Sequence, residues 1–361
     1  MAGLGWRWLA LLFVLCALPA LFLALPEERG DRLAGVQRWS YQLQNIGADL
    51  DKLAGSDSDM LVVDYAKSGG NGMVPLSKAE VERLKTRPDG RRRLVIAYFS
   101  IGEAEEYRHY WQDSWRTSPP SWLLAENCRW PRNHLVAFWN EGWRRIVYDS
   151  PGSYLARIQD AGFDGIYLDR IDVYADIASR HPEARDRMID FVGDLARTAR
   201  SRNPDFLVIA QNAEDLLDNS GYRRIIDAIA KEDLLYGVGG TGVPNPTEMV
   251  AGSRRAIERL RALGKPAFVV EYLSRESDIT AARREFEKAG YRPVFPPRAL
   301  DGRTESTGAS AAPAAAPAKP DASSDDGPKY GTPEYAALHC DGVWRKARPG
   351  DAATPRQSGM P

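Results

Sequence analysis

The sequence predicts an α/β protein with the fold of a (β/α)8 TIM barrel. Eight short apolar runs lie between residues 39 and 297, and helical patterns occur between them. A span of ~260 residues is the usual size of such a barrel. Several runs, such as LVIAYF and AFVV, are almost continuously apolar, which is typical of parallel strands covered on both faces. The predicted strands span residues 41–44, 60–65, 94–100, 165–169, 206–211, 228–232, 267–272 and 293–295.

Helices are predicted between these strands wherever apolar residues recur at helical spacing. The segment 182–200 places its apolar residues on one stripe. The segments 249–263 and 279–289 are followed by Gly264 and Gly290, which suit the left-handed position that ends many helices. Shorter helices are predicted at 77–85 and 153–161.

The alternative fold is an open, doubly wound parallel sheet. Such a sheet normally carries a glycine-rich phosphate turn after an early strand, but the first predicted strand is followed by Asn-Ile-Gly-Ala-Asp at 45–49. The glycine-rich run at 237–242 follows a late strand and leads into prolines. We therefore predict a mobile loop over the barrel mouth there, with phosphate binding as the alternative.

The connection after the third strand, at 102–149, is the longest, and we predict an insertion with substructure of its own. It includes a short extra strand at 133–139. Its tryptophans are Trp111, Trp115, Trp122, Trp130, Trp139 and Trp143.

The two ends of the chain differ from the predicted barrel domain at 30–300. Residues 8–25 are almost wholly apolar, so 1–29 is expected to be a signal peptide or an N-terminal membrane anchor of an exported protein. Residues 301–361 form a predicted disordered Ala/Pro/Ser-rich tail. Within it, 330–345 is a candidate for docking on the domain. A disulfide between Cys128 and Cys340 and two unpaired thiols both remain open.

Composition excludes several classes of function. Lysine and arginine number 48 and the acids 49, so bulk charge does not attract the chain to nucleic acid. Four histidines and three cysteines are few, and they form no metal-binding spacing. A nucleophilic serine in a G-x-S-x-G motif is absent as well. We therefore expect no metal, no cofactor and no nucleic-acid partner.

Carboxylates at the ends of successive predicted strands indicate the chemistry. The carboxyl ends of barrel strands converge on one face, where active sites form. Hydrolysis of a glycosidic bond needs two carboxyls, and Asp169 and Glu232 are the best placed, with Asp172, Glu103 and Glu271 in reserve. The alternative for Asp169 is a salt bridge to Arg170 or another arginine, and for Glu232 one to Lys231. The acids at or after strand ends are Asp64, Glu103, Glu105, Asp169, Asp172, Glu214, Glu232, Asp233 and Glu271.

A substrate-binding surface is predicted around this pair. A surplus of acids would favour a cationic amino-sugar polymer over a sulfated or uronic one. The alternative is that Arg108, Arg170 and Lys231 neutralise the surplus. The predicted substrate contacts are Tyr41, Asp64, Tyr98, Glu103, Glu105, Asp172, Gln211, Asn212, Tyr236 and Glu271.

Several segments resemble glycoside hydrolase family 114, a group that includes endo-α-1,4-polygalactosaminidases and many uncharacterised prokaryotic secreted proteins. The most specific is AYFSIGEAEEYR at 97–108, joined by GIYLDRID at 165–172, QNAE at 211–214 and EYL at 271–273. The resemblance covers residues 39–297. It implies a (β/α)8 barrel that cleaves a galactosamine-rich glycan, with Asp169 as nucleophile and Glu232 as acid/base.

Three functions follow from this sequence. The first is an exported, endo-acting glycosidase that acts as a monomer on an amino-sugar polysaccharide, with its N-terminal segment as a candidate membrane tether. The second is a non-catalytic glycan-binding barrel of the cell envelope. The third is a hydrolase of a neutral α-glucan that uses the same two carboxylates.

Overall fold

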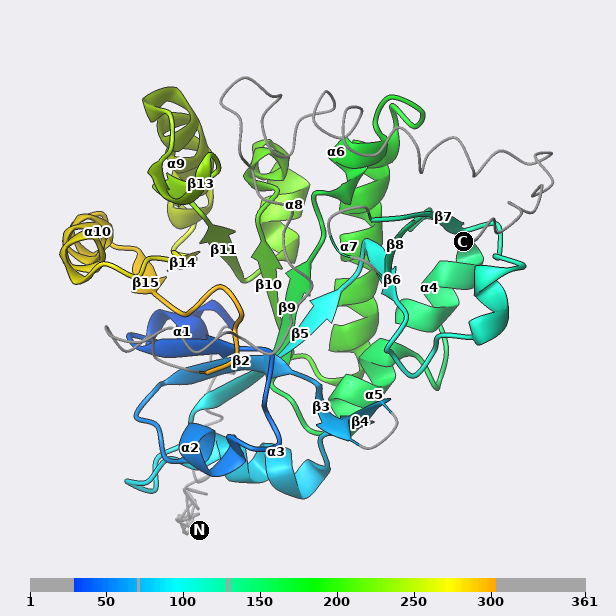
Figure 1. The fold of residues 1–361 in the computed structure, drawn as a ribbon, viewed down its shortest axis with the longest axis horizontal. Coiled ribbons are helices and arrows are strands. Elements are labelled where there is room, and N and C mark those ends of the chain that lie inside the picture. Colours follow the sequence, from blue (N-terminus) through cyan, green and yellow to red (C-terminus); the bar gives the residue numbers. More distant parts are fainter. Residues whose placement is uncertain (1–28, 70–71, 128–129, 131, 303–361) are drawn as a thin grey trace, which may run out of the picture.

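Eight parallel strands form one sheet that curves almost into a closed barrel (Figure 1). The computed structural model describes residues 29–69, 72–127, 130 and 132–302. The strands neighbour one another in chain order, which confirms the predicted (β/α)8 architecture. They are β1 (Trp39–Gln42), β2 (Met60–Asp64), β5 (Leu94–Ser100), β9 (Gly165–Asp169), β10 (Leu207–Gln211), β11 (Ala228–Glu232), β14 (Ala267–Val270) and β15 (Arg292–Val294).

The first and last strands meet where the barrel closes. The indole Nε1 of Trp39 on β1 donates to the carbonyl of Arg292 on β15 at 3.0 Å. The Arg292 guanidinium donates to the carbonyl of Ala34 in the short helix α1 (Arg29–Ala34) at 2.8 Å. These bonds join segments that lie more than 250 residues apart in sequence.

Alternation along the strands produces two apolar cores. Side chains from one face of every strand fill the barrel interior, and those from the other face pack against the surrounding helices. On β5, for example, Ile96 and Tyr98 belong to the interior, whereas Val95, Ala97 and Phe99 belong to the outer core. The near-continuous apolar runs of the sequence are explained by burial on both faces.

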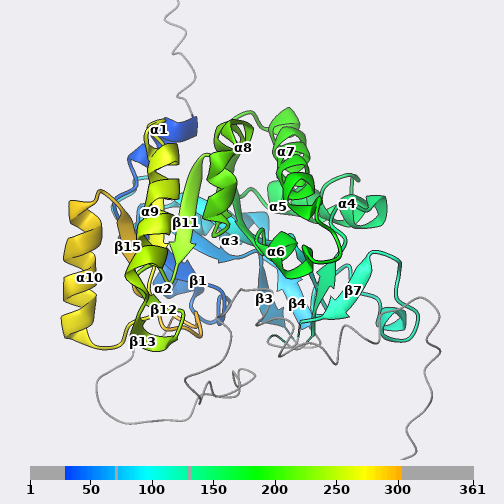
Figure 2. The same cartoon turned by 90° about the horizontal axis from the view of Figure 1, so that it is seen from above.

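Helices surround the sheet on its outer side (Figures 1 and 2). The predicted helices are all present, with ends shifted by at most three residues, and Gly264 and Gly290 adopt the expected positive φ of 77° and 75°. The remaining helices are short and were not predicted. The helices beyond α1 are α2 (Leu50–Ala54), α3 (Lys78–Lys85), α4 (Glu141–Val147), α5 (Tyr154–Asp160), α6 (Val173–Ile177), α7 (Ala184–Arg202), α8 (Ser220–Ile225), α9 (Thr247–Arg261) and α10 (Glu276–Lys288), with the 3-10 helices η1 (Asp113–Arg116) and η2 (Glu214–Asp218).

The connection after β5 has substructure of its own, as predicted. It forms a three-stranded antiparallel sheet from β6 (Glu103–Glu105), β8 (Asn133–Val136) and β7 (Leu123–Glu126). Four of its tryptophans pack in a chain with ring centroids 5.0–5.2 Å apart: Trp111, Trp115, Trp122 and Trp143. These rings therefore form a core for the insertion.

Two hairpins follow strands of the barrel. The first, β3 (Ala66–Gly69) with β4 (Gly72–Pro75), follows β2, and the second, β12 (Tyr236–Gly237) with β13 (Gly240–Pro244), follows β11. Figure 2 shows both on the side of the molecule opposite α1. The glycine-rich run at 237–242, for which we predicted a mobile loop over the barrel mouth, forms part of this second hairpin.

The first strand begins and ends two residues earlier than predicted. Its ladder with β2 ends at Gln42, because the backbone N–H groups of Leu43 and Gln44 both donate to the carbonyl of Leu300, at 2.8 and 2.9 Å. The segment at Leu300 thus takes the place of β2 as the hydrogen-bond partner of the residues after Gln42. The sequence near residue 41 contains no signal for that contact.

The predicted leader, tail segment 330–345, Cys128 and Cys340 lie outside the described residues. In the part of the chain that is described, no helix is long and apolar enough to cross a membrane.

Candidate active site

The last residue of five neighbouring strands is polar. Each lies two positions beyond a side chain of the barrel interior, so each points into the carboxyl end of the barrel. The strands thus bring four of the predicted site residues to one face, together with Ser100, for which no role was predicted. In sheet order the row is Asp64, Ser100, Asp169, Gln211 and Glu232.

Asp169 accepts two hydrogen bonds from fixed donors. The Tyr98 hydroxyl donates to Oδ2 at 2.6 Å, and the backbone N–H of Arg170 donates to Oδ1 at 2.7 Å. Both donors are on or directly after barrel strands, so they fix the orientation of the carboxylate. Two such bonds stabilise a negative charge.

Glu232 lies two strands from Asp169, with β10 between them. The Tyr272 hydroxyl donates to its Oε1, and Nδ2 of Asn212 is 3.4 Å from its Oε2. Burial, followed by the negative charge of Asp169, raises the pKa of Glu232 to about 7. The pair therefore combines a hydrogen-bonded carboxylate with a carboxyl that retains its proton near neutral pH, as acid/base chemistry requires.

The residues that follow three of these strands have left-handed backbones. Arg170, Asn212 and Asp233 have φ values of 58°, 56° and 50°. A positive φ in residues other than glycine is strained, and such strain gathers at functional sites. The turn at Asn212 lets its Oδ1 accept from the backbone N–H of Glu232 at 3.1 Å.

Tyrosine rings lie beside the pair inside the barrel. The rings of Tyr41 and Tyr167 are 5.2 Å apart, and the Tyr41 hydroxyl donates to Oε1 of Gln211 at 3.5 Å. Burial raises the pKa of both tyrosines, and the charges of Glu232 and Asp169 raise it further. Tyr167 is fully buried, and its hydroxyl has no hydrogen-bond partner among the described residues.

Asp64 and Glu105 belong to one buried ion-pair cluster. The Arg108 guanidinium donates to both oxygens of Asp64, at 2.7 and 2.9 Å, and its Nε donates to Oε2 of Glu105 at 2.6 Å. Glu105 also accepts from the Tyr107 hydroxyl at 2.6 Å. These carboxylates were predicted to bind substrate, but they are buried and their charge is satisfied by Arg108.

Glu103 and Asp172 lie around Arg170, which bonds to both. Arg170 Nε donates to Glu103 at 2.7 Å, and its terminal nitrogens donate to Asp172 at 3.1 Å and to Asp176 at 2.6 Å. The Glu103 side chain is 1% exposed, whereas that of Asp172 is 43% exposed. Of these two predicted substrate contacts, only Asp172 offers its carboxylate to a ligand. The predicted alternative of an Asp169–Arg170 salt bridge is not formed, since the Arg170 side chain pairs with the other three acids.

Glu271 and Tyr236 lie beside the segment that follows Glu232. The backbone N–H of Leu235 donates to Oε1 of Glu271 at 2.6 Å, and Glu271 has no exposed surface. Burial raises the pKa of Glu271 to about 8. The half-buried Tyr236 begins the β12–β13 hairpin. Glu271 was predicted as a substrate contact, and the structure instead places it under this segment as a support.

The acids at this face outnumber the cations that pair with them. Arg108, Arg170 and Lys231 all form ion pairs with nearby carboxylates, as the alternative prediction expected, but they are too few to neutralise the surplus of acids. Asp169 and Glu232 take part in none of these ion pairs. Four cations, with Arg298 as the fourth, pair with seven carboxylates: Asp64, Glu103, Glu105, Asp172, Asp176, Glu214 and Asp233.

Sequence reasoning did not assign a role to Tyr167 or Arg298. The alternation of β9 could have shown Tyr167, because it lies two residues before Asp169 on the same face. Arg298 lies beyond the last strand, and no local pattern marks its contact with Asp233.

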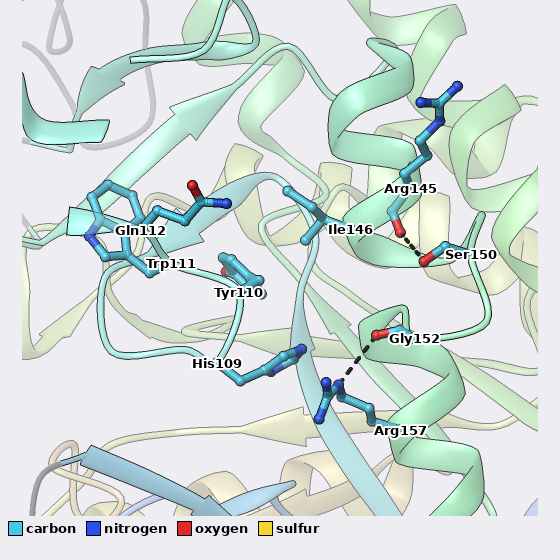
Figure 3. A pocket seen from close by; sticks show the side chains of 9 residues that line it. All are labelled: His109, Tyr110, Trp111, Gln112, Arg145, Ile146, Ser150, Gly152 and Arg157. Atoms are coloured by element: carbon cyan, nitrogen blue, oxygen red, sulfur yellow. Dashed lines mark hydrogen bonds between the residues drawn. The ribbon is translucent and has the colours of Figure 1, made fainter. Parts of the chain in front are cut away.

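A hollow of about 450 Å³ is lined by neither Asp169 nor Glu232 (Figure 3). Segments around β6, α4 and α5 line it, with rings from His109, Tyr110 and Trp111 and two cations, Arg145 and Arg157. It contains no carboxylate and none of the strand-end row. Among the described residues, no group of three or more His, Cys, Asp or Glu side chains is arranged to hold a metal ion.

A model of glycoside-hydrolase family GH114 matches residues 26–311, which includes the whole barrel and the acid pair. The chain belongs to family GH114. This GH114 protein is 35% identical to an uncharacterized protein of Deinococcus radiodurans over 280 residues, which are 76% of this chain and 85% of the relative. It is 36% identical to uncharacterized proteins of Methanocaldococcus jannaschii and Thermotoga maritima. Those matches cover 65% and 66% of this chain, and 66% and 72% of the relatives.

Solved structures support the fold of this GH114 protein. The glycoside hydrolase domain of PelA from Pseudomonas aeruginosa matches with a TM-score of 0.56 and 19% identity. That match covers 74% of this chain and 97% of the PelA domain. A variant of the same domain matches with a TM-score of 0.55 and 18% identity.

Proposed function

We propose that this protein is a glycosidase that cleaves a cationic, galactosamine-rich polysaccharide, with Asp169 as nucleophile and Glu232 as acid/base. The observation that carries the proposal is the contrast between the two carboxyls. Asp169 accepts two hydrogen bonds that stabilise its charge, whereas burial and that charge keep a proton on Glu232. Membership of family GH114 supports the reaction class.

The proposed mechanism assigns the proton of Glu232 to the leaving glycosidic oxygen. Asp169 then attacks the anomeric carbon or stabilises the positive charge that develops there. After departure of the leaving group, a water molecule gives a proton to the ionised Glu232 and its oxygen bonds to the anomeric carbon. The bond from that carbon to Asp169, where it has formed, breaks in the same step and releases Asp169 as a carboxylate. Tyr98 orients Asp169 and Tyr272 orients Glu232, because their hydroxyls bond directly to the two carboxyls.

The charge around the site supports a substrate with free amines. Seven paired carboxylates share four cations, so the face has a negative surplus even before Asp169 is counted. The negative electrostatic field of these acids attracts polysaccharides with free amines and raises their association rate. Asp172 is the most exposed of the acids around Arg170, and we assign it to an amine of the substrate. We also propose that the apolar leader exports the protein.

The test is release of reducing ends from α-1,4-galactosamine oligomers, both deacetylated and N-acetylated. The full chain is compared with Asp169→Asn, Glu232→Gln and Glu248→Gln, the last being an exposed carboxyl in the first turn of α9. We expect release by the wild type and Glu248→Gln only. Release should fall with added salt and with acetylation, because both weaken attraction to the acids.

Two results would contradict the proposal in different ways. Equal binding by all four proteins with no release would indicate a glycan-binding barrel. Release that is unaffected by acetylation and salt would indicate a neutral glycan as the substrate class.

A further inference from the structure

Arg298 connects two residues that contact or adjoin Glu232. Its terminal nitrogens donate to both oxygens of Asp233, at 2.7 and 3.1 Å. Its guanidinium also lies over the ring of Tyr272, 4.2 Å from the centroid. Asp233 directly follows Glu232 in the chain, and the Tyr272 hydroxyl donates to the Glu232 carboxyl. One side chain thus holds both the backbone and the hydrogen-bond donor of this carboxyl.

The backbone at Asp233 needs such support. Its φ of 50° is strained for an aspartate, and its carbonyl accepts from Nδ2 of Asn245 at 2.7 Å. A side chain at Gly237 would place its Cβ 2.3 Å from Oδ1 of Asp233, so this glycine makes room for the carboxylate that Arg298 binds. The arrangement is therefore tightly enclosed on the hairpin side.

The segment that carries Arg298 is anchored to the first strand. Leu300 accepts from the N–H groups of Leu43 and Gln44, and its own N–H donates to the carbonyl of Pro297 at 2.9 Å. The position of Arg298 is consequently set by the closure of the barrel. No part of the proposed mechanism above uses this residue.

We propose that Arg298 is a positioning residue for Glu232, acting through Tyr272 and Asp233 to hold the carboxyl in its donating orientation. This inference rests on the proposed function, because it takes Glu232 as the acid/base. The guanidinium fork fixes Asp233, and the stacking fixes the plane of the Tyr272 ring. Lysine offers a charge without a planar fork and cannot replace either contact fully.

The charge of Arg298 also acts on Glu232 through space. It lowers the pKa of Glu232, opposing the stronger effects of burial and Asp169. Removing it should therefore move the Glu232 titration to higher pH, with unpaired Asp233 acting in the same direction. The titratable and charged groups that surround Glu232 are Asp169, Tyr167, Tyr41, Asp233, Tyr272 and Arg298.

The chain contains a matched control at Arg261. Its guanidinium donates to both oxygens of Glu258, at 2.7 and 3.0 Å, and lies 5.2 Å from the centroid of the Tyr291 ring. The Tyr291 hydroxyl donates to Glu258 at 3.0 Å. Arg261 reaches both oxygens through one nitrogen, Nη1, so it repeats the ion pair and the ring contact of Arg298 but not the two-nitrogen fork. Arg261 and Glu258 lie on α9, outside the strand-end row, so the loss of Arg261 tests stability alone.

The experiment compares the full chain with Arg298→Gln, Arg298→Lys and Arg261→Gln. Carboxyl resonances of 13C-labelled glutamate are followed through pH, with the Glu232 resonance assigned by its absence in Glu232→Gln. We expect Arg298→Gln to raise the Glu232 midpoint and to lower kcat by about 10²-fold, the cost of a small misplacement. Arg298→Lys should keep the midpoint close to wild type but still lose kcat, and Arg261→Gln should change neither.

An unchanged Glu232 midpoint in Arg298→Gln, with a kcat no lower than that of Arg261→Gln, would overturn the inference. If the wild type cleaves no amino-sugar oligomer, the proposed function fails. The titration of Glu232 would still report whether Arg298 controls this carboxyl, so the two failures are distinguishable.

Discussion

Replacing Glu232 with glutamine should stabilise the protein at pH 8 while abolishing its activity. Burial and the Asp169 charge raise the pKa of Glu232 from 4.5 to about 7 in the folded state. The folded protein therefore holds this proton more tightly than the unfolded chain does. The resulting stabilisation is complete below pH 4.5 and is lost as the pH rises through 7.

The size of this effect follows from the pKa difference. A shift from 4.5 to about 7 corresponds to a difference on the order of 3 kcal/mol between low and high pH. This is an upper bound, because Glu232 retains some exposure to solvent. Glutamine does not ionise, so the stability of Glu232→Gln does not decrease in this way above pH 7.

Urea unfolding at pH 5 and pH 8 measures the effect. The free energy of unfolding of Glu232→Gln, relative to wild type, should be higher at pH 8 than at pH 5. The exposed control Glu248→Gln should show no such pH dependence. Equal differences at both pH values would refute the claim that the fold keeps Glu232 protonated, and with it the assignment of Glu232 as the acid.

Three further predictions concern other parts of the molecule. Wild-type kcat/KM should fall above pH 7, to about a tenth of its plateau one unit higher, as the acid loses its proton; a plateau extending to pH 9 would contradict this. Tyr98→Phe removes a hydrogen bond to the Asp169 carboxylate. The activation free energy should rise by about 1.5–3 kcal/mol, so kcat should fall at least tenfold, while the midpoint of urea unfolding stays nearly unchanged. Full activity of this variant would exclude a role for the bond. Arg108→Met leaves two buried carboxylates unpaired, so the free energy of unfolding in urea should fall by about 3–5 kcal/mol. Replacement of the exposed Arg92 by methionine should lower it only slightly. Equal losses in the two variants would show that the buried cluster does not stabilise the fold.

The strands and the acid pair could be predicted because their signals are local. Continuous apolar runs mark strands buried on both faces, and an acid at the end of such a run must lie at the barrel mouth. Asp169 and Glu232 were found in this way. Partners in ion pairs could not be found, since Arg108 reaches Asp64 across 44 residues and Arg298 reaches Asp233 across 65.

The same limit explains why several acids were assigned to substrate. A carboxylate after a strand has the same local sequence whether it binds a ligand or an arginine. Glu105 is 2% exposed and bonded to Arg108, whereas the Asp172 side chain is 43% exposed. Only the folded chain separates them, because the exposure of each carboxylate depends on packing against residues that are distant in sequence.

Left-handed residues after the strands show how the fold separates the acid pair from neighbouring charges. Read along the chain, Asp169 and Arg170 would be expected to form a salt bridge. The positive φ of Arg170 instead directs its backbone N–H to Asp169, while its guanidinium binds three other carboxylates. Asp233 is turned in the same way after Glu232, and its carboxylate binds Arg298. In both cases the side chain of the left-handed residue is held in ion pairs with other residues, so it does not pair with the proposed catalytic carboxyl beside it. Strain of this kind persists only where the surrounding structure enforces it. We therefore infer that these turns keep Asp169 and Glu232 free of ion pairs with the residues next to them in the chain.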